Sequence, residues 1–266
     1  MLNRGFTRSA ADPFLPYDGA SYNQPKTFST PVIAAGEVTA VLVAAGQSNG
    51  ANNVDTTYTA TNPTKIANFN HNDGGTYVAS EPLNGCTGPS TLGSGNMFYR
   101  VADKLITAGI FQRVILVPLC WDGTTVATWG AGSLSNRIPN AVRRLTAVGL
   151  SPTLFCWQQG ESDNTGATSQ AAYAASLAQV IAQPRALGAN APWFIAKCSY
   201  ISGTVAANVQ NAQAGILSGP SQIYVGADTD SLTGTAVNRQ ADNTHFKAAG
   251  ADAAATLWKT AIDVIF

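Results

Sequence analysis

The stretch that decides the fold is VTAVLVAA (residues 38–45), followed directly by the loop GQSNG (46–50). A short, β-branched apolar run bounded by glycine predicts a strand buried on both faces of a sheet. A serine just after such a strand presents its hydroxyl at the carboxyl edge of the sheet, and the glycines allow a tight turn there. Ser48 is therefore a candidate nucleophile, although Ser, Asn and Gly are also normal in a plain strand-to-helix turn.

Similar apolar runs recur along the chain and predict further strands. They are 113–119, 153–158, 193–197, a weaker run at 222–227 and a candidate edge strand at 66–69. Apolar residues at helical spacing lie between them. These segments are 97–109, 134–148, one beginning near 169, one around 209–217 and one from about 247. Alternating strands and helices predict an α/β fold with a parallel sheet covered by helices on both faces.

The chain has 266 residues and no second region of distinct composition, which favours a single large domain. Residues 1–35 are rich in Pro, Ser, Thr and Asn and show no sustained period. We therefore expect an N-terminal arm or linker over 1–35 and one α/β domain over 36–266.

Charge and hydropathy exclude several classes of partner. The fifteen basic residues balance the fifteen acidic ones, and no basic cluster occurs. This argues against nucleic-acid binding and against polybasic membrane docking. No apolar run approaches the ~18 residues of a membrane span. The sequence shows no recognisable signal peptide, and its polar, weakly charged composition favours an extracellular or virion-associated protein. It does not indicate an oligomeric state.

Four cysteines, at positions 86, 120, 156 and 198, form no CxxC pair, which argues against a zinc site. We expect small buried thiols. The sequence leaves open whether any two of them are bridged.

Only two histidines, His71 and His245, could act as a base for Ser48. His71 lies in a polar, turn-rich loop and is expected to be a solvated loop residue. His245 follows Asp242 by three residues, a spacing at which the carboxylate can accept the ring N–H and orient the imidazole. The alternative is that Asp242 caps the last helix and His245 is incidental.

A third loop, WQQGESD (157–163), follows the strand expected at 153–158. A side-chain amide at a strand end can donate to an oxyanion, although the loop could also be a simple capped turn. Its two carboxylates, Glu161 and Asp163, raise the alternatives of a metal site or a glycosidase pair. Neither carboxylate has the further partners that those sites need, so we expect no metal.

GQSN (46–49), WQQGESD (157–163) and DNTH (242–245) occur in an order that resembles the SGNH (GDSL-like) hydrolases. The resemblance is closest to their carbohydrate-esterase branch, which includes the family 6 acetylxylan esterases and sialate-O-acetylesterase-like proteins. GSGNMF (93–98) and PLCWDGTTVATW (118–129) also fit that pattern. The resemblance implies a three-layer α/β/α sandwich with a flavodoxin-like parallel sheet of about five strands.

The resemblance also implies the roles of individual residues. Ser48 is the nucleophile, His245 the general base and later acid, and Asp242 the residue that orients His245. The oxyanion hole consists of the backbone N–H groups of Ser48 and Gly95 and the side-chain amide of Gln159. Gly93, two residues earlier, could supply the glycine amide instead. No metal or organic cofactor is needed for this chemistry.

Further residues are expected around the substrate. The candidates for substrate contact are Gln47, Asn49, Trp121, Asp122 and Trp129. Each tryptophan is either a core residue or a sugar-stacking one. Glu161 is expected to tie loops together through hydrogen bonds. Trp121 and Asp122 stand where relatives often have small residues or glycine, so they could reshape the substrate pocket.

The implied function is that of a serine esterase, removing O-acetyl groups from a carbohydrate through an acetyl-enzyme intermediate. Acetylxylan, sialic acid and bacterial surface polysaccharide all remain open as substrates. A short-chain lipase or thioesterase on the same triad is one alternative. A non-catalytic carbohydrate-binding module is another.

Overall fold

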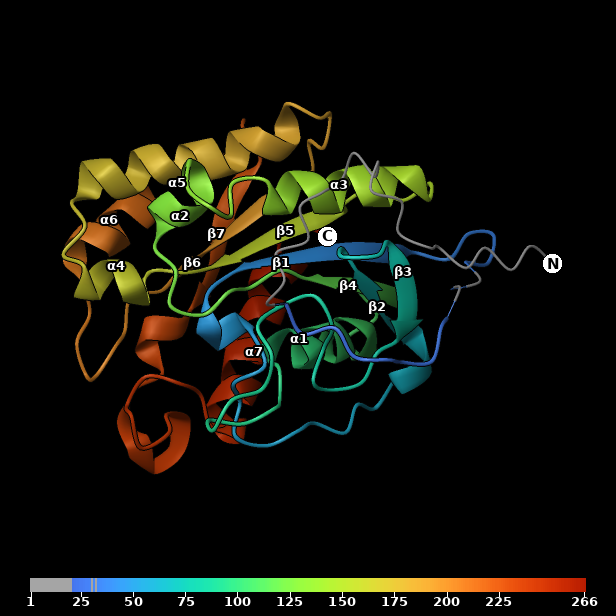
Figure 1. Cartoon of the computed structure of the whole chain (residues 1–266), viewed down its shortest axis with the longest axis horizontal. Helices are drawn as coiled ribbons and strands as arrows, with labels where there is room; N and C mark the ends of the chain where they lie inside the picture. The colour runs from blue at the N-terminus through green and yellow to red at the C-terminus, as the bar shows by residue number, and fades with distance from the viewer. Residues whose placement is uncertain (1–20, 30, 32) are drawn as a thin grey trace.

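The computed structural model describes residues 21–266 except 30 and 32. Its centre is a seven-stranded sheet of order β3-β2-β4-β1-β5-β6-β7, in which only the β2–β3 pair is antiparallel (Figure 1). The strands are β1 (Thr39–Gly46), β2 (Ile66–Asn70), β3 (Gly75–Val78), β4 (Arg113–Pro118), β5 (Leu154–Gln158), β6 (Trp193–Lys197) and β7 (Ile223–Asp228).

β1 is the central strand, as its apolar run predicts. Leu42 pairs with Leu116 of β4 on one side and with Leu154 of β5 on the other. The side chains of alternate β1 residues pack into two separate hydrophobic cores, one on each face of the sheet. Leu42 packs in the cluster below the sheet, and Val43 packs in the cluster above it. A strand buried on both faces needs apolar side chains at successive positions, which explains the run VLVAA.

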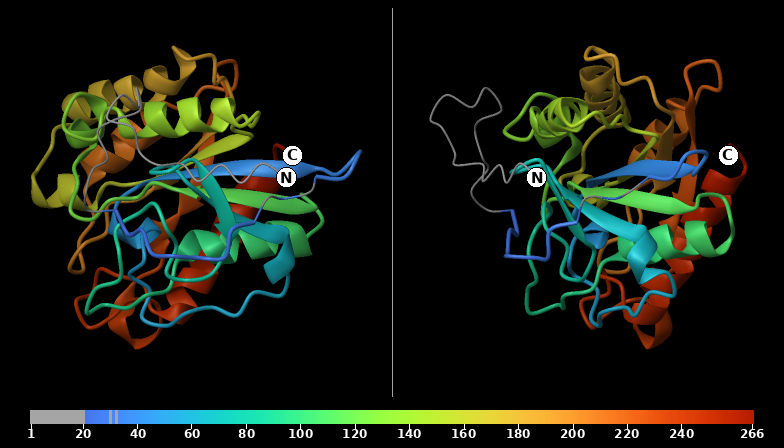
Figure 2. Two further views of the ribbon diagram at one scale, coloured as in Figure 1. Left: turned by 45° about the vertical axis from the view of Figure 1, so that its right-hand side comes forward. Right: turned by 90° about the vertical axis from the view of Figure 1, so that its right-hand side faces the viewer.

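Helices cover both faces of the sheet (Figure 1, Figure 2). On one face lie α1 (Met97–Thr107) and α7 (Ala248–Asp263). The other face carries α2 (Val126–Gly130), α3 (Arg137–Ala147), α5 (Gln170–Arg185) and α6 (Ala207–Gly215). Shorter turns are α4 (Glu161–Thr165), η1 (Ser48–Gly50), η2 (Pro63–Lys65), η3 (Thr229–Ser231) and η4 (Gly234–Asn238). The expected three-layer α/β/α sandwich is confirmed.

The sheet has two strands more than the expected five or so. β2 was expected at an edge, but all five of its residues are buried, because β3 pairs along its outer side. β3 has only four residues and follows a polar turn, so it carries too little apolar pattern to be recognised from the sequence.

His71 is not the solvated loop residue that the sequence predicts. It lies just after β2 and is buried, with only 6% of its surface exposed. Burial lowers its pKa to about 3, so the ring is neutral at physiological pH. The polar residues around it hydrogen bond with one another inside the protein, as Asn72 does with Asn70. The polar composition of this turn predicts exposure, but these internal hydrogen bonds allow it to be buried.

The described part of the predicted N-terminal arm lies along the domain. The Tyr22 N–H donates to Cys86 O at 2.8 Å, and the Val78 N–H donates to Thr27 O at 2.9 Å. Residues 1–20, 30 and 32 of the predicted arm lie outside the described residues. The division at residue 36 stays a prediction.

The four cysteines are free and buried, which confirms the expectation of buried thiols. Burial raises the pKa of all four thiols. Within the described residues, no group of His, Cys, Asp and Glu side chains is arranged to hold a metal ion. No helix in this part of the chain is long and apolar enough to cross a membrane.

Candidate active site

The candidate site lies where β1 and β5 end side by side. Gly46 closes β1 with φ +136°, and a Cβ there would lie 2.0 Å from Gln158 O of β5. Only glycine fits this close approach. The chain then turns sharply, the Gln47 N–H donates to Gln158 O at 2.9 Å, and η1 begins at Ser48. The turn places the Ser48 hydroxyl at the carboxyl edge of the sheet, as expected.

Ser48, His245 and Asp242 are joined by hydrogen bonds, although Ser48 and Asp242 lie 194 positions apart in the chain. The distance from His245 Nε2 to Ser48 Oγ is 2.8 Å, and that from His245 Nδ1 to Asp242 Oδ2 is 2.5 Å. This geometry suits removal of the Ser48 proton by an imidazole that a carboxylate orients.

The Asp242 carboxylate is itself held in place. Its Oδ1 accepts the backbone N–H groups of Thr244 at 2.9 Å and His245 at 3.0 Å. Burial acts to raise the pKa of Asp242, but the hydrogen bonds from His245 and Thr244 outweigh it and lower the pKa below its ordinary value. Asp242 is therefore ionised at neutral pH, in the form that pairs with His245.

Asn49 links the serine loop (residues 46–50) to the histidine loop (residues 242–246) through hydrogen bonds. Its Nδ2 donates to Glu161 Oε1 at 2.8 Å and to Thr244 O at 3.2 Å, and its Oδ1 accepts the Phe246 N–H at 3.1 Å. Asn49 thus grips the residues on both sides of His245. Its side chain is only 3% exposed and donates both N–H groups internally, which disfavours the predicted substrate contact.

Glu161 accepts the Asn49 N–H, and its role of tying loops together stays a prediction. It is 1% exposed, and burial raises the pKa of its carboxyl. The charge of Arg239 acts in the opposite direction. Arg239 donates to Thr244 O at 2.6 Å and stacks its guanidinium 4.1 Å from the Phe246 ring centre. The sequence carries no signal for this role of Arg239, because nothing distinguishes it from a surface arginine.

The oxyanion hole differs from the expected one at the glycine. The Gly95 N–H donates to Val54 O at 2.9 Å, and the Gly93 N–H donates to Ser90 O at 3.2 Å. Neither glycine amide is therefore available to an oxyanion in this structure. The Ser48 N–H, by contrast, has no hydrogen-bond partner among the described residues.

Gln159 also lies behind the site instead of in the oxyanion hole. It is fully buried, and its Nε2 donates to Thr124 O at 2.9 Å and to Asp163 Oδ2 at 2.5 Å. A third acceptor, Gln47 Oε1, lies 3.1 Å from Nε2, so three acceptors already share the two N–H groups of this amide. Tyr173 in turn donates to Gln159 Oε1 at 2.9 Å, which fixes the amide orientation. The predicted donation to an oxyanion would require this network to open.

Gln47 and Asp163 complete that buried network. Gln47 Oε1 accepts the Ser162 N–H and an N–H of Gln159 Nε2, each at 3.1 Å. Substrate contact by Gln47 stays a prediction. Asp163 accepts the Val126 N–H at 2.8 Å and so holds the start of α2. Asp163 and Glu161 are both buried and have separate hydrogen-bond partners.

The two tryptophans expected near a sugar have different surroundings. Trp129 is 1% exposed, packs edge-on against Trp157 and donates to Thr124 Oγ1 at 2.9 Å. The prediction of a sugar contact is therefore wrong for Trp129, because its ring has no accessible face. Trp121 is half-buried, and the Arg137 guanidinium lies 4.7 Å from its ring centre. A sugar contact by Trp121 stays a prediction.

Comparison with known families agrees with this site. The family model for carbohydrate esterases of the sialic acid-specific acetylesterase type matches residues 38–261, which include Ser48, Asp242 and His245. The chain belongs to this family. It is thus a carbohydrate O-acetylesterase, and the resemblance to SGNH hydrolases of the carbohydrate-esterase branch is confirmed. Among curated proteins, none matches the esterase.

Solved structures share the fold of the esterase at low sequence identity. A protein from Arabidopsis thaliana matches with a TM-score of 0.65 and 20% identity, over 85% of this chain and 98% of that one. NanS matches with a TM-score of 0.54 and 17% identity, over 86% and 97%. A carbohydrate acetylesterase from Xanthomonas citri has a TM-score of 0.54 and 16% identity, over 85% of this chain and 56% of its own.

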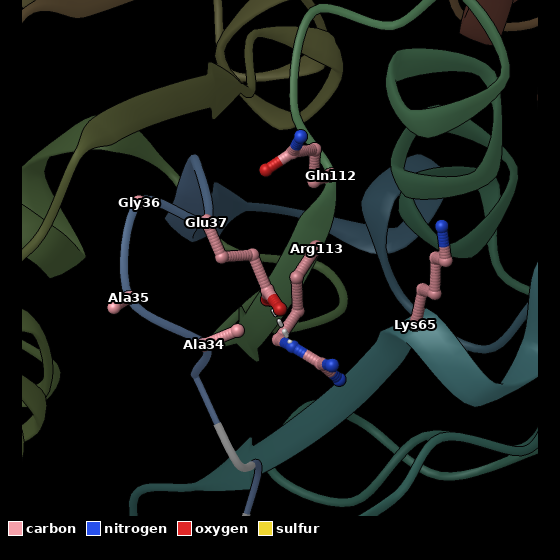
Figure 3. A pocket seen from close by; sticks show the side chains of 7 residues that line it. All are labelled: Ala34, Ala35, Gly36, Glu37, Lys65, Gln112 and Arg113. Atoms are coloured by element: carbon pink, nitrogen blue, oxygen red, sulfur yellow. Dashed lines mark hydrogen bonds and ion pairs between the residues drawn. The ribbon is translucent and has the colours of Figure 1, made fainter.

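One hollow of the esterase lies away from this site. It has a volume of about 340 Å³ and lies beside the amino ends of β1 and β4, whereas Ser48 follows the carboxyl end of β1 (Figure 3). Arg113 Nε lies 2.5 Å from Glu37 Oε1 at its wall. The hydrogen bond from Arg113 lowers the pKa of Glu37. We interpret this pair as a structural tie at the start of the sheet.

Proposed function

We propose that the esterase uses Ser48 as nucleophile, His245 as general base and Asp242 as the residue that orients it, and that its substrate is an O-acetylated carbohydrate. The observation that carries this proposal is the hydrogen-bonded chain from Ser48 Oγ through the His245 ring to Asp242. Family membership supports the carbohydrate acetyl ester as the substrate class.

In the first half-reaction, Ser48 Oγ attacks the acetyl carbonyl while His245 Nε2 takes the hydroxyl proton. The negative charge that develops on the carbonyl oxygen is met by the Ser48 N–H, which has no hydrogen-bond partner in the described part of the chain. The bond to the sugar oxygen then breaks, and His245 returns the proton to that oxygen. Acetyl-Ser48 and a free sugar hydroxyl result.

In the second half-reaction, His245 Nε2 takes a proton from water, and the resulting hydroxide adds to the acetyl carbonyl. The bond to Ser48 Oγ breaks as His245 returns the proton to it. Acetate leaves and Ser48 is regenerated. Asp242 remains ionised throughout and stabilises the protonated imidazole.

The test is acetate release from 4-nitrophenyl acetate, acetylated xylan and O-acetylated sialic acid by wild type and Ser48→Ala. Ser151→Ala is a matched control, since Ser151 is exposed and precedes β5 at the opposite edge of the sheet. We expect activity to disappear in Ser48→Ala only. Equal rates for wild type and Ser48→Ala would contradict the proposal that Ser48 is the nucleophile.

Chain-length preference separates the acetylesterase from a lipase or thioesterase on the same triad. The chain beyond Ser48 carries Asn49, Asn52 and Asn53 instead of the apolar side chains that would line a groove for a long acyl chain. We expect 4-nitrophenyl acetate to react faster than the octanoate. The reverse order would favour the lipase interpretation.

A further inference from the structure

Asp122 is a carboxylate beside the candidate site that ester hydrolysis does not require. Asn53 Nδ2 lies 2.9 Å from both of its oxygens and also donates to the carbonyl oxygen of Ser48 at 3.2 Å. The backbone N–H of Asp122 donates to Thr87 Oγ1 at 2.9 Å. These contacts hold the half-buried carboxylate near Ser48, with the Asn53 side chain bonded to both residues.

Little positive charge balances Asp122. Burial raises its pKa, while the Asn53 hydrogen bond and the charge of protonated His245 act to lower it. Among the described residues, no lysine or arginine lowers the pKa of this carboxyl. Arg239, behind the histidine loop, is 1% exposed and directs its N–H groups to backbone carbonyls, among them Thr229 O and Thr244 O.

A negative charge near a developing oxyanion opposes ester hydrolysis, whereas its attraction to protonated His245 favours it, so the chemical step gives Asp122 no clear role. Substrate recognition gives it one. An ionised carboxylate offers about four acceptor positions, and the Asn53 and Thr87 side chains occupy only part of them. The remaining lone pairs on this half-buried group can accept hydrogen bonds from hydroxyl groups, which are abundant on sugars.

We propose that Asp122 is a specificity-determining residue that selects uncharged, hydroxyl-bearing acetyl esters over anionic ones. Its remaining lone pairs accept hydrogen bonds from hydroxyl groups of the sugar that carries the acetyl group. Its negative charge repels a carboxylate on the substrate. This inference rests on the proposed function. It predicts that the chain prefers neutral acetylated sugars to O-acetylated sialic acid, although the description of its family names a sialic acid-specific acetylesterase.

A matched pair of esters isolates the charge effect. 4-Acetoxybenzoate is an anion, and its methyl ester is neutral, while both carry the same aryl acetate. Wild type should have the higher kcat/KM for the neutral ester. Asp122→Asn, which keeps the shape and removes the charge, should reduce this preference about three- to tenfold, as expected for one charge at ~6–8 Å near a protein surface.

Two controls accompany this measurement. Added salt should raise the wild-type rate on the anionic ester and have little effect on that rate in Asp122→Asn. Asp263→Asn removes the same charge from an exposed ion pair at the end of α7 and should keep the wild-type preference.

The hydroxyl contacts are tested with acetylated xylo-oligosaccharide against 4-nitrophenyl acetate, which has no hydroxyl group. Asp122→Ala should lower kcat/KM about tenfold more for the sugar than for the aryl ester, in line with the loss of one or two hydrogen bonds to a charged group. Asp122→Asn retains an acceptor oxygen and should lose less than Asp122→Ala.

The outcomes separate this inference from the proposed function. An unchanged ester preference in Asp122→Asn, or an equal loss on all esters, would overturn the role of Asp122. Faster hydrolysis of O-acetylated sialic acid than of the neutral acetylated sugar by wild type would also overturn the role of Asp122. If Ser48→Ala were as active as wild type, the proposed function itself would fail.

Discussion

Ser48 and His245 owe their alignment to side chains that do not take part in the proposed chemistry. Asn49 bonds the residues before and after His245, and buried Glu161 accepts the remaining Asn49 N–H. Asp242 is held by two backbone N–H groups. A serine hydroxyl is a weak nucleophile until a base is placed within hydrogen-bond reach, so these positioning contacts matter as much as the reacting groups.

Asp242→Asn tests how His245 is oriented. The asparagine amide can place an N–H opposite His245 Nδ1, which favours the wrong tautomer of the ring. We expect kcat for 4-nitrophenyl acetate to fall by about 10²–10⁴-fold with a nearly unchanged folded structure. Steady-state kinetics and circular dichroism check this. A fall of less than about threefold would contradict the orienting role.

Asn49→Ala should reduce both activity and stability. It removes three hydrogen bonds, one of them to the buried Glu161 carboxyl, so we expect a loss of about 2–4 kcal/mol in the free energy of unfolding. Urea unfolding measures this. The double variant Asn49→Ala/Glu161→Gln removes the buried charge and should recover part of the stability.

The control for Asn49→Ala is Asn190→Ala, in an exposed loop. It should leave the free energy of unfolding within about 0.5 kcal/mol of wild type. An equal effect of both variants, or no recovery in the double variant, would contradict the positioning role of Asn49.

The elements position the site through close contact at their ends. β1 and β5 run side by side, and their last residues meet at Gly46 and Gln158. η1 then starts at Ser48 directly after β1. The histidine loop precedes α7, which packs against α1 on one face of the sheet (Figure 1). Two loops from distant parts of the chain thus meet at the same edge, the usual place for chemistry in such sheets.

Gly46→Ala should damage this junction. Its Cβ would overlap Gln158 O in a backbone conformation that disfavours L-residues, so β1 and β5 would have to separate locally. We expect a loss of about 2–4 kcal/mol in stability, measured by urea unfolding, and a strong loss of activity.

Gly215→Ala at the end of α6 is the matched control, since no atom lies within 4 Å of its added Cβ and its φ is not positive. It should be neutral or slightly stabilising. Similar losses for both glycine variants would contradict the packing argument at Gly46.

For the molecule as a whole, the sequence predicts the layers better than the side-chain contacts. Long apolar runs identify the buried strands, because a strand covered on both faces requires them, whereas short β3 leaves no such pattern. Trp129 and Gln159 were assigned to the substrate and the oxyanion, yet both lie in the interior. Which way such a side chain points depends on residues distant in sequence, and no local pattern encodes that.

Stability of the whole domain should depend on pH through Glu81. Burial raises the pKa of Glu81 to about 7, from 4.5 in an unstructured chain. The folded state therefore binds the proton more tightly, and the stabilising contribution is full below pH 4.5 and is lost as the pH rises through about 7. The maximum slope is about 1 kcal/mol per pH unit.

Glu81→Gln should flatten this decline, since glutamine does not titrate. Urea unfolding of wild type and variant between pH 4.5 and 7 measures the difference. Parallel stability curves for the two proteins over that range would contradict the assignment to Glu81.

The central claim is that Ser48 carries the acetyl group during turnover. The most direct measurement is acid quenching of the enzyme during hydrolysis of 4-nitrophenyl acetate, followed by peptide mapping by mass spectrometry. We predict an acetyl group on the peptide that contains Ser48, traced to Ser48 itself and absent from Ser48→Ala. Acetate release without any acetylated Ser48, or undiminished turnover by Ser48→Ala, would contradict the account.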